Sequence, residues 1–127
     1  MIDHVSIAVR DLATGAAAYE AVLATLGYAR LVARPDTVGF GKKYPEFWLN
    51  RRATMASAPG SGAHVALRAV SAEAVDAFHH AALAAGFACD GAPGLRPEYS
   101  SRYYAAFVRD ADGNRIEAVT FLADGAR

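Results

Sequence analysis

Apolar residues alternate with other residues along positions 2–9, where Val5, Ile7 and Val9 share one side and His4 lies on the other. An alternation with a period of two is typical of a strand that buries one face. This segment is therefore predicted to be a half-buried strand whose histidine points away from the aliphatic row.

A helical pattern follows the first strand. Asp11 is a candidate N-cap, and Gly27 supplies a stop. Between them, apolar residues recur at helical spacing, and these are Tyr19, Val22, Leu23 and Leu26. Short strand patterns then occupy residues 28–33, 37–41 and 46–50. The first half of the chain is thus predicted to have the order βαβββ.

The second half repeats this order. Alternation returns at residues 63–70 with His64 on the non-aliphatic side, Ser71 is a candidate helix cap, and Gly86 matches the earlier glycine stop. Three further strands are expected at residues 87–90, at residues 103–109 and around Glu117. The first two are separated by GAPGLRPEYSS, an insertion expected to form a loop. His4 and His64 occupy the same place in the two repeats.

The repeat defines the expected fold class and domain organisation. We expect an α+β protein in which two tandem βαβββ modules form a paired, barrel-like mixed sheet with one helix per module. Residues 1–127 would be a single domain, with module one at 1–50 and module two at 63–127. Residues 51–62 are rich in Ala, Ser, Pro and Gly and are predicted to be the linker.

Charge and composition exclude some classes of partner. The formal net charge is +0, with 13 basic and 13 acidic residues, so no polyanion partner such as nucleic acid is expected. No apolar run approaches the roughly 18 residues needed to cross a bilayer. The N-terminus lacks the basic start and apolar core of a signal peptide. A cytoplasmic protein without a membrane segment is expected.

Glu117 lies in an otherwise apolar strand pattern, between Ile116 and Ala118. Burying a carboxylate there is costly unless a positive group meets it. Two histidines open first strands upstream, and two imidazoles with one carboxylate are a plausible ligand set for a divalent ion. The hypothesis is a metal site formed by His4, His64 and Glu117.

Two βαβββ repeats, a histidine opening each repeat and the run D-x-D-G-N-x-I-E at residues 110–117 resemble the vicinal oxygen chelate superfamily. This superfamily includes glyoxalase I, extradiol dioxygenases, and fosfomycin and bleomycin resistance proteins. The resemblance implies a divalent ion (zinc, manganese, nickel or iron) held by His4, His64 and Glu117. It also implies a homodimer and a small substrate that chelates the ion through two neighbouring oxygens. In such proteins the ligands meet within one chain or across a dimer, and both remain open here.

The chain also departs from the glyoxalase I pattern. The repeat aligns Trp48 with Glu117, at a position where glyoxalase I carries a further acidic or amide ligand. Three activities therefore stay open: a glyoxalase-like lyase or isomerase, a ring-cleaving dioxygenase, and a metal-free drug-binding protein like the bleomycin resistance proteins. Aromatic and basic side chains are candidate substrate contacts, although strand aromatics are often core and arginines often solvated. These candidates are Trp48, Tyr99, Tyr103 and Arg68, with Arg96 as a similar basic group in the inserted loop.

Overall fold

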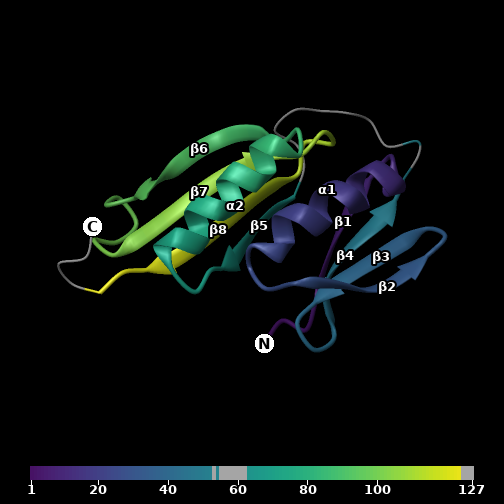
Figure 1. The fold of residues 1–127 in the computed structure, drawn as a ribbon, viewed down its shortest axis with the longest axis horizontal. Coiled ribbons are helices and arrows are strands. Elements are labelled where there is room, and N and C mark those ends of the chain that lie inside the picture. Colours follow the sequence, from purple (N-terminus) through teal and green to yellow (C-terminus); the bar gives the residue numbers. More distant parts are fainter. Residues whose placement is uncertain (53, 55–62, 124–127) are drawn as a thin grey trace.

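The computed structural model describes residues 1–52, 54 and 63–123, and it contains the predicted repeat. Each module is one strand, one helix and three strands in sequence (Figure 1). The first module consists of β1 (Val5–Val9), α1 (Leu12–Ala24), β2 (Ala29–Arg34), β3 (Thr37–Gly41) and β4 (Pro45–Arg51). The second consists of β5 (His64–Arg68), α2 (Ala72–Ala84), β6 (Ala88–Leu95), β7 (Tyr103–Arg109) and β8 (Arg115–Phe121).

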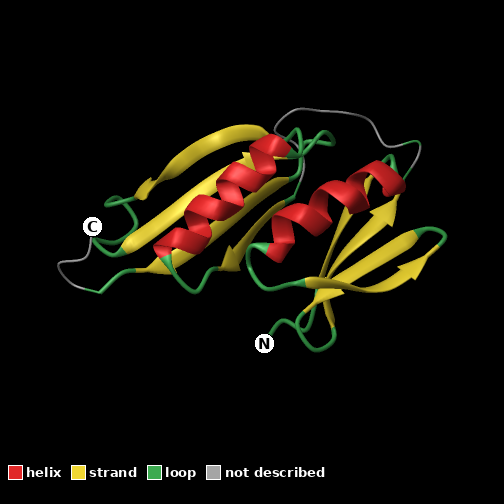
Figure 2. Ribbon diagram, in the orientation of Figure 1, coloured by secondary structure: helices red, strands yellow, loops and turns green. Residues whose placement is uncertain are grey.

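Each module forms its own four-stranded mixed sheet. The strand orders are β1-β4-β3-β2 and β5-β8-β7-β6, with one parallel pair in each sheet, β1 with β4 and β5 with β8. Both helices lie on the same side of the sheets (Figure 2). The expected paired mixed sheet is confirmed, and it is a curved pair of sheets rather than a closed barrel.

The helices begin and end where the sequence pattern predicts. The Asp11 carboxylate accepts a hydrogen bond from the Thr14 amide at 3.0 Å, and the Ser71 hydroxyl accepts one from the Ala74 amide at 3.1 Å. Gly27 follows α1 with a φ of +85°, a left-handed conformation that glycine adopts without strain. The buried helix faces pack on the aliphatic rows of the strands to form the core.

Several predicted boundaries shift in the structure, and three of them concern the candidate site or the linker. β1 begins at Val5, so His4 precedes the strand and is exposed rather than lying within it. β6 continues to Leu95, so half of the inserted segment is strand rather than loop. Arg51, placed in the linker, still belongs to β4. Most of the predicted linker, residues 53 and 55–62, lies outside the described residues.

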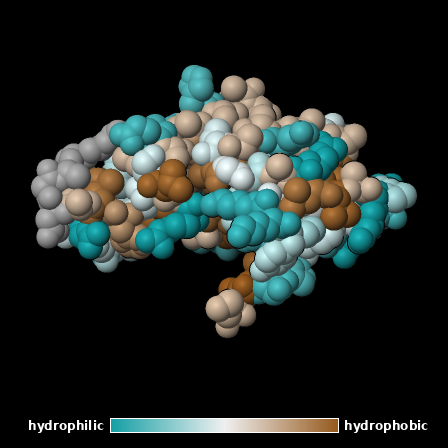
Figure 3. Space-filling model, turned by 60° about the horizontal axis from the view of Figure 1, so that its bottom comes forward, coloured by the Kyte–Doolittle hydropathy of each residue, from teal (hydrophilic) through white to brown (hydrophobic). Residues whose placement is uncertain are grey.

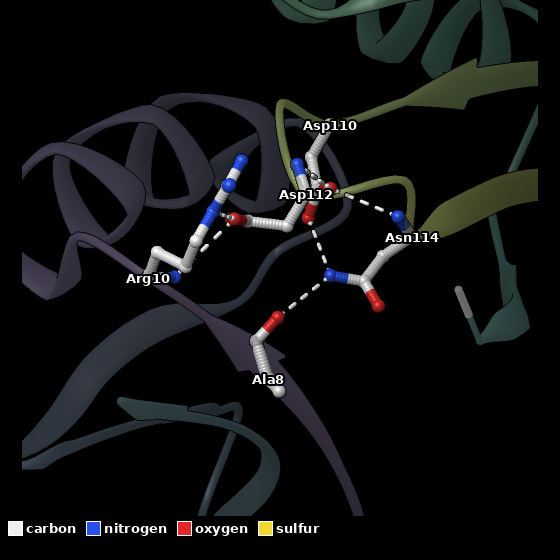
Figure 4. A network of polar contacts seen from close by, with 5 residues as sticks. All are labelled: Ala8, Arg10, Asp110, Asp112 and Asn114. Carbon is white, nitrogen blue, oxygen red and sulfur yellow. Dashed lines mark hydrogen bonds and ion pairs between the residues drawn. The ribbon is translucent and has the colours of Figure 1, made fainter. Parts of the chain in front are cut away.

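Polar side chains join the two modules at the turn between β7 and β8 (Figure 4). The Asn114 amide nitrogen donates to the Ala8 carbonyl of β1 and to the Asp110 carboxylate, both at 2.9 Å. The Arg10 side chain meets Asp112 at 3.0 Å. The turn predicted from the sequence is therefore confirmed, and it also connects module two to module one.

Tyr19 of α1 strengthens the same junction from the helix layer. Its buried hydroxyl donates to Asp110 at 2.6 Å, while its ring packs against Phe47 and Phe87. Burial, followed by the charge of Asp110, raises the pKa of Tyr19 well above its ordinary value. The phenol therefore remains a neutral donor to the Asp110 carboxylate.

Within residues 1–52, 54 and 63–123, neither helix has the length and apolar character required to span a lipid bilayer.

Candidate functional site

Glu117 is the buried centre of the candidate site. Its side chain is 3% exposed, and the strand register places it beside Ala66 of β5 and Phe107 of β7. His64 lies two residues before Ala66 in β5 and so on the same face of the sheet as Glu117. Its Nε2 is 3.0 Å from the Glu117 Oε1. The His64 side chain is 55% exposed, so the pair connects a buried carboxylate to the surface.

Tyr103 of β7 contacts the other oxygen of the carboxylate. Its hydroxyl donates a hydrogen bond to the Glu117 Oε2. Burial, the hydrogen bond to Glu117 and the charge of that carboxylate raise the pKa of Tyr103 to about 12. Tyr103 is therefore a protonated donor at neutral pH and fixes the orientation of Glu117.

His4 does not join this pair in the chain. It is exposed, and its Nδ1 lies 2.9 Å from Asp3. Asn114 touches both the Ala8 carbonyl, near the end of β1, and the amide of Ala63, just before His64. The end of β1 therefore lies beside the start of β5.

An extended chain from Ala8 back to His4 covers about 13 Å at roughly 3.3 Å per residue. His4 and His64 line one hollow, but His4 contacts Asp3, whereas His64 contacts Glu117. Among the described residues, no group of three His, Cys, Asp or Glu side chains is placed to hold a metal ion. Of the predicted ligands, the structure brings His64 and Glu117 together but leaves His4 apart.

The donor types nevertheless fit a divalent ion. An imidazole and a carboxylate in direct contact are ligands of zinc, manganese, nickel and iron. Tyr103 provides the type of outer hydrogen bond that orients a carboxylate ligand. One chain therefore offers two candidate ligands, His64 and Glu117, and one group that orients the carboxylate, Tyr103. Protein metal sites usually have three or four protein ligands, so a further ligand is needed.

An aromatic row extends from this pair toward solvent. Tyr99 packs edge-on against Tyr103 with ring centroids 5.1 Å apart, and Tyr103 packs against Phe121 at 5.3 Å. Tyr99 is 63% exposed, and Arg68 covers the Phe121 ring with its Cζ 4.7 Å from the centroid. Three of the four predicted substrate contacts, Tyr99, Tyr103 and Arg68, thus form one continuous series.

Trp48, the fourth predicted contact, lies in the other sheet. It faces Ser6 of β1, just as Glu117 faces Ala66 of β5, which confirms the repeat alignment. Arg34 lies over its ring at 5.7 Å. Trp48 therefore occupies in module one the place that Glu117 has in module two. It lies in a different sheet from the aromatic row of Tyr99, Tyr103 and Phe121.

His64 borders two surface hollows. One has a volume of about 510 Å³ and extends over Phe107 toward Tyr99 and Arg96. The other, of about 370 Å³, is also lined by His4 and Glu46. A separate cavity of about 200 Å³ at the module junction shares no lining residue with these two hollows. The site is therefore open to small molecules from the side of His64.

Sequence reasoning missed two members of this region. Phe107 forms the floor between His64 and Arg96, and Asn114 positions the β5 edge. An aromatic residue in a strand is ordinarily assigned to the core, so Phe107 gave no distinct signal. Asn114 belonged to the D-x-D-G-N-x-I-E run, but its contact with Ala8 is separated by 106 positions along the chain.

Comparison with known proteins identifies the family. Residues 1–118 match the model of the glyoxalase/bleomycin resistance protein/dioxygenase superfamily. The chain belongs to this superfamily, and its repeated fold agrees with that assignment. No curated protein matches the sequence.

Solved structures of the same superfamily resemble the chain over nearly its whole length. A glyoxalase/bleomycin resistance protein from Albidiferax ferrireducens T118 is 33% identical, with a TM-score of 0.81, covering 92% of this chain and 96% of its own. A family enzyme from Burkholderia phytofirmans PsJN is 21% identical, with a TM-score of 0.72 and coverages of 95% and 98%. The fosfomycin resistance protein FosX from Listeria monocytogenes is 14% identical, with a TM-score of 0.71 and coverages of 98% and 95%. The last two share the fold.

Proposed function

We propose that the protein is a divalent-metal-dependent enzyme of the glyoxalase/dioxygenase type that acts on a small oxygen-chelating substrate. The observation that carries the proposal is Glu117, a 3% exposed carboxylate held between the His64 imidazole and the Tyr103 hydroxyl. A structural role alone would not require a histidine that is 55% exposed beside a hollow. The ion would act as a Lewis acid toward two neighbouring substrate oxygens.

The third protein ligand in this proposal is His4 of a second copy of the chain. In support of this, His4 contacts Asp3 within one chain rather than His64 or Glu117, and Asn114 holds the start of β5 near Ala8, four residues along the chain from His4. The N-terminal segment also stands out from the surface (Figure 3), with Ile2 79% exposed. Residues 1–4 protrude and include His4, whose imidazole could bind a metal ion on a neighbouring subunit. The protein would then be a homodimer.

The protein's own residues would have distinct roles in such a site. His64 and Glu117 would bind the ion, and Tyr103 would hold Glu117 in the orientation that exposes one oxygen lone pair to the ion. Tyr99 and Arg68, at the two ends of the aromatic row, would contact the substrate. Trp48 would be added by the module-one sheet of the second copy.

Metal analysis of variants tests the proposal. The purified protein is expected to bind one divalent ion per chain, and His64→Ala is expected to lose it. Glu46→Gln is the matched control, because Glu46 borders the same hollow as His64 without touching Glu117. Equal metal content in His64→Ala and the unmodified protein would contradict the proposal.

Subunit mixing tests the cross-chain ligand separately. His4→Ala and Glu117→Gln are each expected to bind no metal as pure dimers. After the two are mixed and re-paired at random, half of the dimers are mixed, and each of these has one intact site. Metal content should therefore recover to about one quarter of the unmodified value. No recovery would place all ligands within one chain.

A metal-free sequestering protein is the second candidate function. The exposed edge-on series of Tyr99, Tyr103 and Phe121 favours it, because such rings suit the binding of a planar organic molecule. Absence of metal even after reconstitution, combined with retained binding of an aromatic compound, would select this function.

A further inference from the structure

The hollow of about 510 Å³ beside His64 contains a guanidinium that the surrounding chain holds in one position. Arg96 lies over the Phe107 ring, with its Cζ 5.2 Å from the ring centroid. Its Nη2 donates to the Ala92 carbonyl at 2.6 Å, and its Nη1 lies 3.4 Å from the Leu95 carbonyl. A stacked and doubly tethered arginine loses little conformational entropy when a ligand binds.

Two glycines leave the space that this guanidinium occupies. A Cβ at Gly91 would lie 3.2 Å from Nη2, and a Cβ at Gly94 would lie 3.2 Å from Nη1. At Gly91 it would also lie 2.8 Å from the Phe107 ring. The register of β6 against β7 shifts at both glycines, which bends the strand around the arginine. The inserted segment is thus shaped to seat Arg96.

The positive charge of Arg96 is left without a carboxylate partner. Both of its acceptors are neutral carbonyls, and the structure records no ion pair for Arg96 within residues 1–52, 54 and 63–123. Asp90 of the same hollow is already engaged by Arg109 at 2.9 Å and lies 3.6 Å from Arg115. Glu98, the other acidic residue of the hollow, is exposed. An anion from solution would therefore bind more favourably to Arg96 than to Arg115, whose charge is partly offset by Asp90.

Phe107 connects this guanidinium to the candidate metal pair. Its ring centroid is 6.3 Å from that of His64 and 5.2 Å from the Arg96 Cζ. A small molecule that spans the hollow beside Phe107 would have one end near His64 and the other near Arg96. The two ends of the hollow thus offer different chemistry to a single ligand.

We propose that Arg96 binds an oxyanionic group, a carboxylate or a phosphate, on the substrate whose other end is held at His64 and Glu117. The link to a substrate at the metal pair depends on the proposed function, whereas anion binding at Arg96 does not. The substrate class is therefore a small acid that has a chelating pair of oxygens and a second, anionic end.

The first test uses metal-free protein with inorganic phosphate or acetate as the probe. In the unmodified protein the Arg96 Nε–Hε resonance is followed by NMR. Dissociation constants are taken from the backbone amide resonance of Gly94, which lies beside the guanidinium and is also present in Arg96→Gln. Arg102→Gln is the matched control, because Arg102 directly follows the same segment and also donates to a backbone carbonyl, that of Leu122, but does not line the hollow. The tighter of the two probes indicates the preferred oxyanion.

Binding of the preferred probe is expected to weaken at least about fivefold in Arg96→Gln and to stay unchanged in Arg102→Gln. Equal weakening in the two variants would reflect general charge and would overturn the proposal. An Arg96 resonance that neither probe moves would overturn it as well.

The second test uses zinc-loaded protein with catechol and 3,4-dihydroxybenzoate, which share a chelating pair and differ in one carboxylate. The preference is the ratio of the dissociation constants of catechol and 3,4-dihydroxybenzoate, and it is expected to fall about tenfold in Arg96→Gln. The carboxylate also changes the acidity of the chelating oxygens, but that effect is the same in both proteins and cancels when the two ratios are compared. An unchanged preference overturns the anion site but leaves the metal function intact. Failure of both probes to bind, with phosphate or acetate still contacting Arg96, overturns the proposed chelation of a substrate by the ion and retains the anion site.

Discussion

Replacing Asn114 by alanine tests whether one amide side chain joins the two modules. The side chain donates two hydrogen bonds at 2.9 Å, one to the Ala8 carbonyl of module one and one to the Asp110 carboxylate. A neutral hydrogen bond contributes about 1 kcal/mol, and one to a charged group contributes about 2 kcal/mol. Loss of both in a residue that is 3% exposed should lower the free energy of unfolding by about 3 kcal/mol.

Urea unfolding at one fixed protein concentration measures this change. With a slope of about 1.5 kcal/mol per molar urea, the midpoint should fall by about 2 M. Asn50→Ala is the matched control, since Asn50 accepts one hydrogen bond from Thr37 within module one. Its midpoint should fall by less than about 0.7 M. A fall in Asn114→Ala no larger than that in Asn50→Ala would refute the reasoning.

Three further predictions concern the tyrosines and a close-packed glycine. The pKa of Tyr103 is raised to about 12 in the folded protein. The stabilisation of the fold by the protonated Tyr103 hydroxyl is therefore complete below about pH 10 and is lost as the pH rises through about 12. Tyr103→Phe should therefore remove one high-pH step from the tyrosinate absorbance titration, and an unchanged titration would contradict the assignment. Tyr19→Phe removes the hydrogen bond to Asp110 and should cost about 2 kcal/mol, which a thermal scan detects, whereas an unaltered melting temperature would argue against it. Gly39→Ala places a Cβ 2.9 Å from the ring of Trp48, the single tryptophan. The free energy of unfolding should therefore fall by about 1–3 kcal/mol, and the tryptophan emission should shift. Unchanged emission would show that the contact is not tight.

The repeated fold could be predicted because each element has a local signal. Alternation around Val5 and Val65, caps at Asp11 and Ser71, and glycine stops specify strands and helices without knowledge of distant contacts. β6 was predicted too short because its glycines disfavour a strand locally. In the structure, hydrogen bonding to β7 overrides that preference, with irregular register at Gly91 and Gly94.

The candidate site was only partly predictable for a related reason. His64 and Glu117 lie on adjacent parallel strands of one module. The sequence pattern indicated these two strands, and the family resemblance implied that the two side chains meet. The place of His4 depends on how the modules join, and that is decided by contacts such as Asn114 with Ala8, which leave no periodic trace in the sequence. The cradle of Arg96 depends on side-chain packing against Phe107, which is equally invisible before the fold is known.

The metal content of Glu117→Gln, compared with that of the unmodified protein, tests the central claim most directly. Glutamine preserves the size of the side chain and its contact with Tyr103 but removes the negative charge that would bind the ion. The account predicts near-stoichiometric divalent metal in the unmodified protein and a loss of most of it in the variant. Equal metal content in the two proteins, or no metal in either after reconstitution, would contradict it.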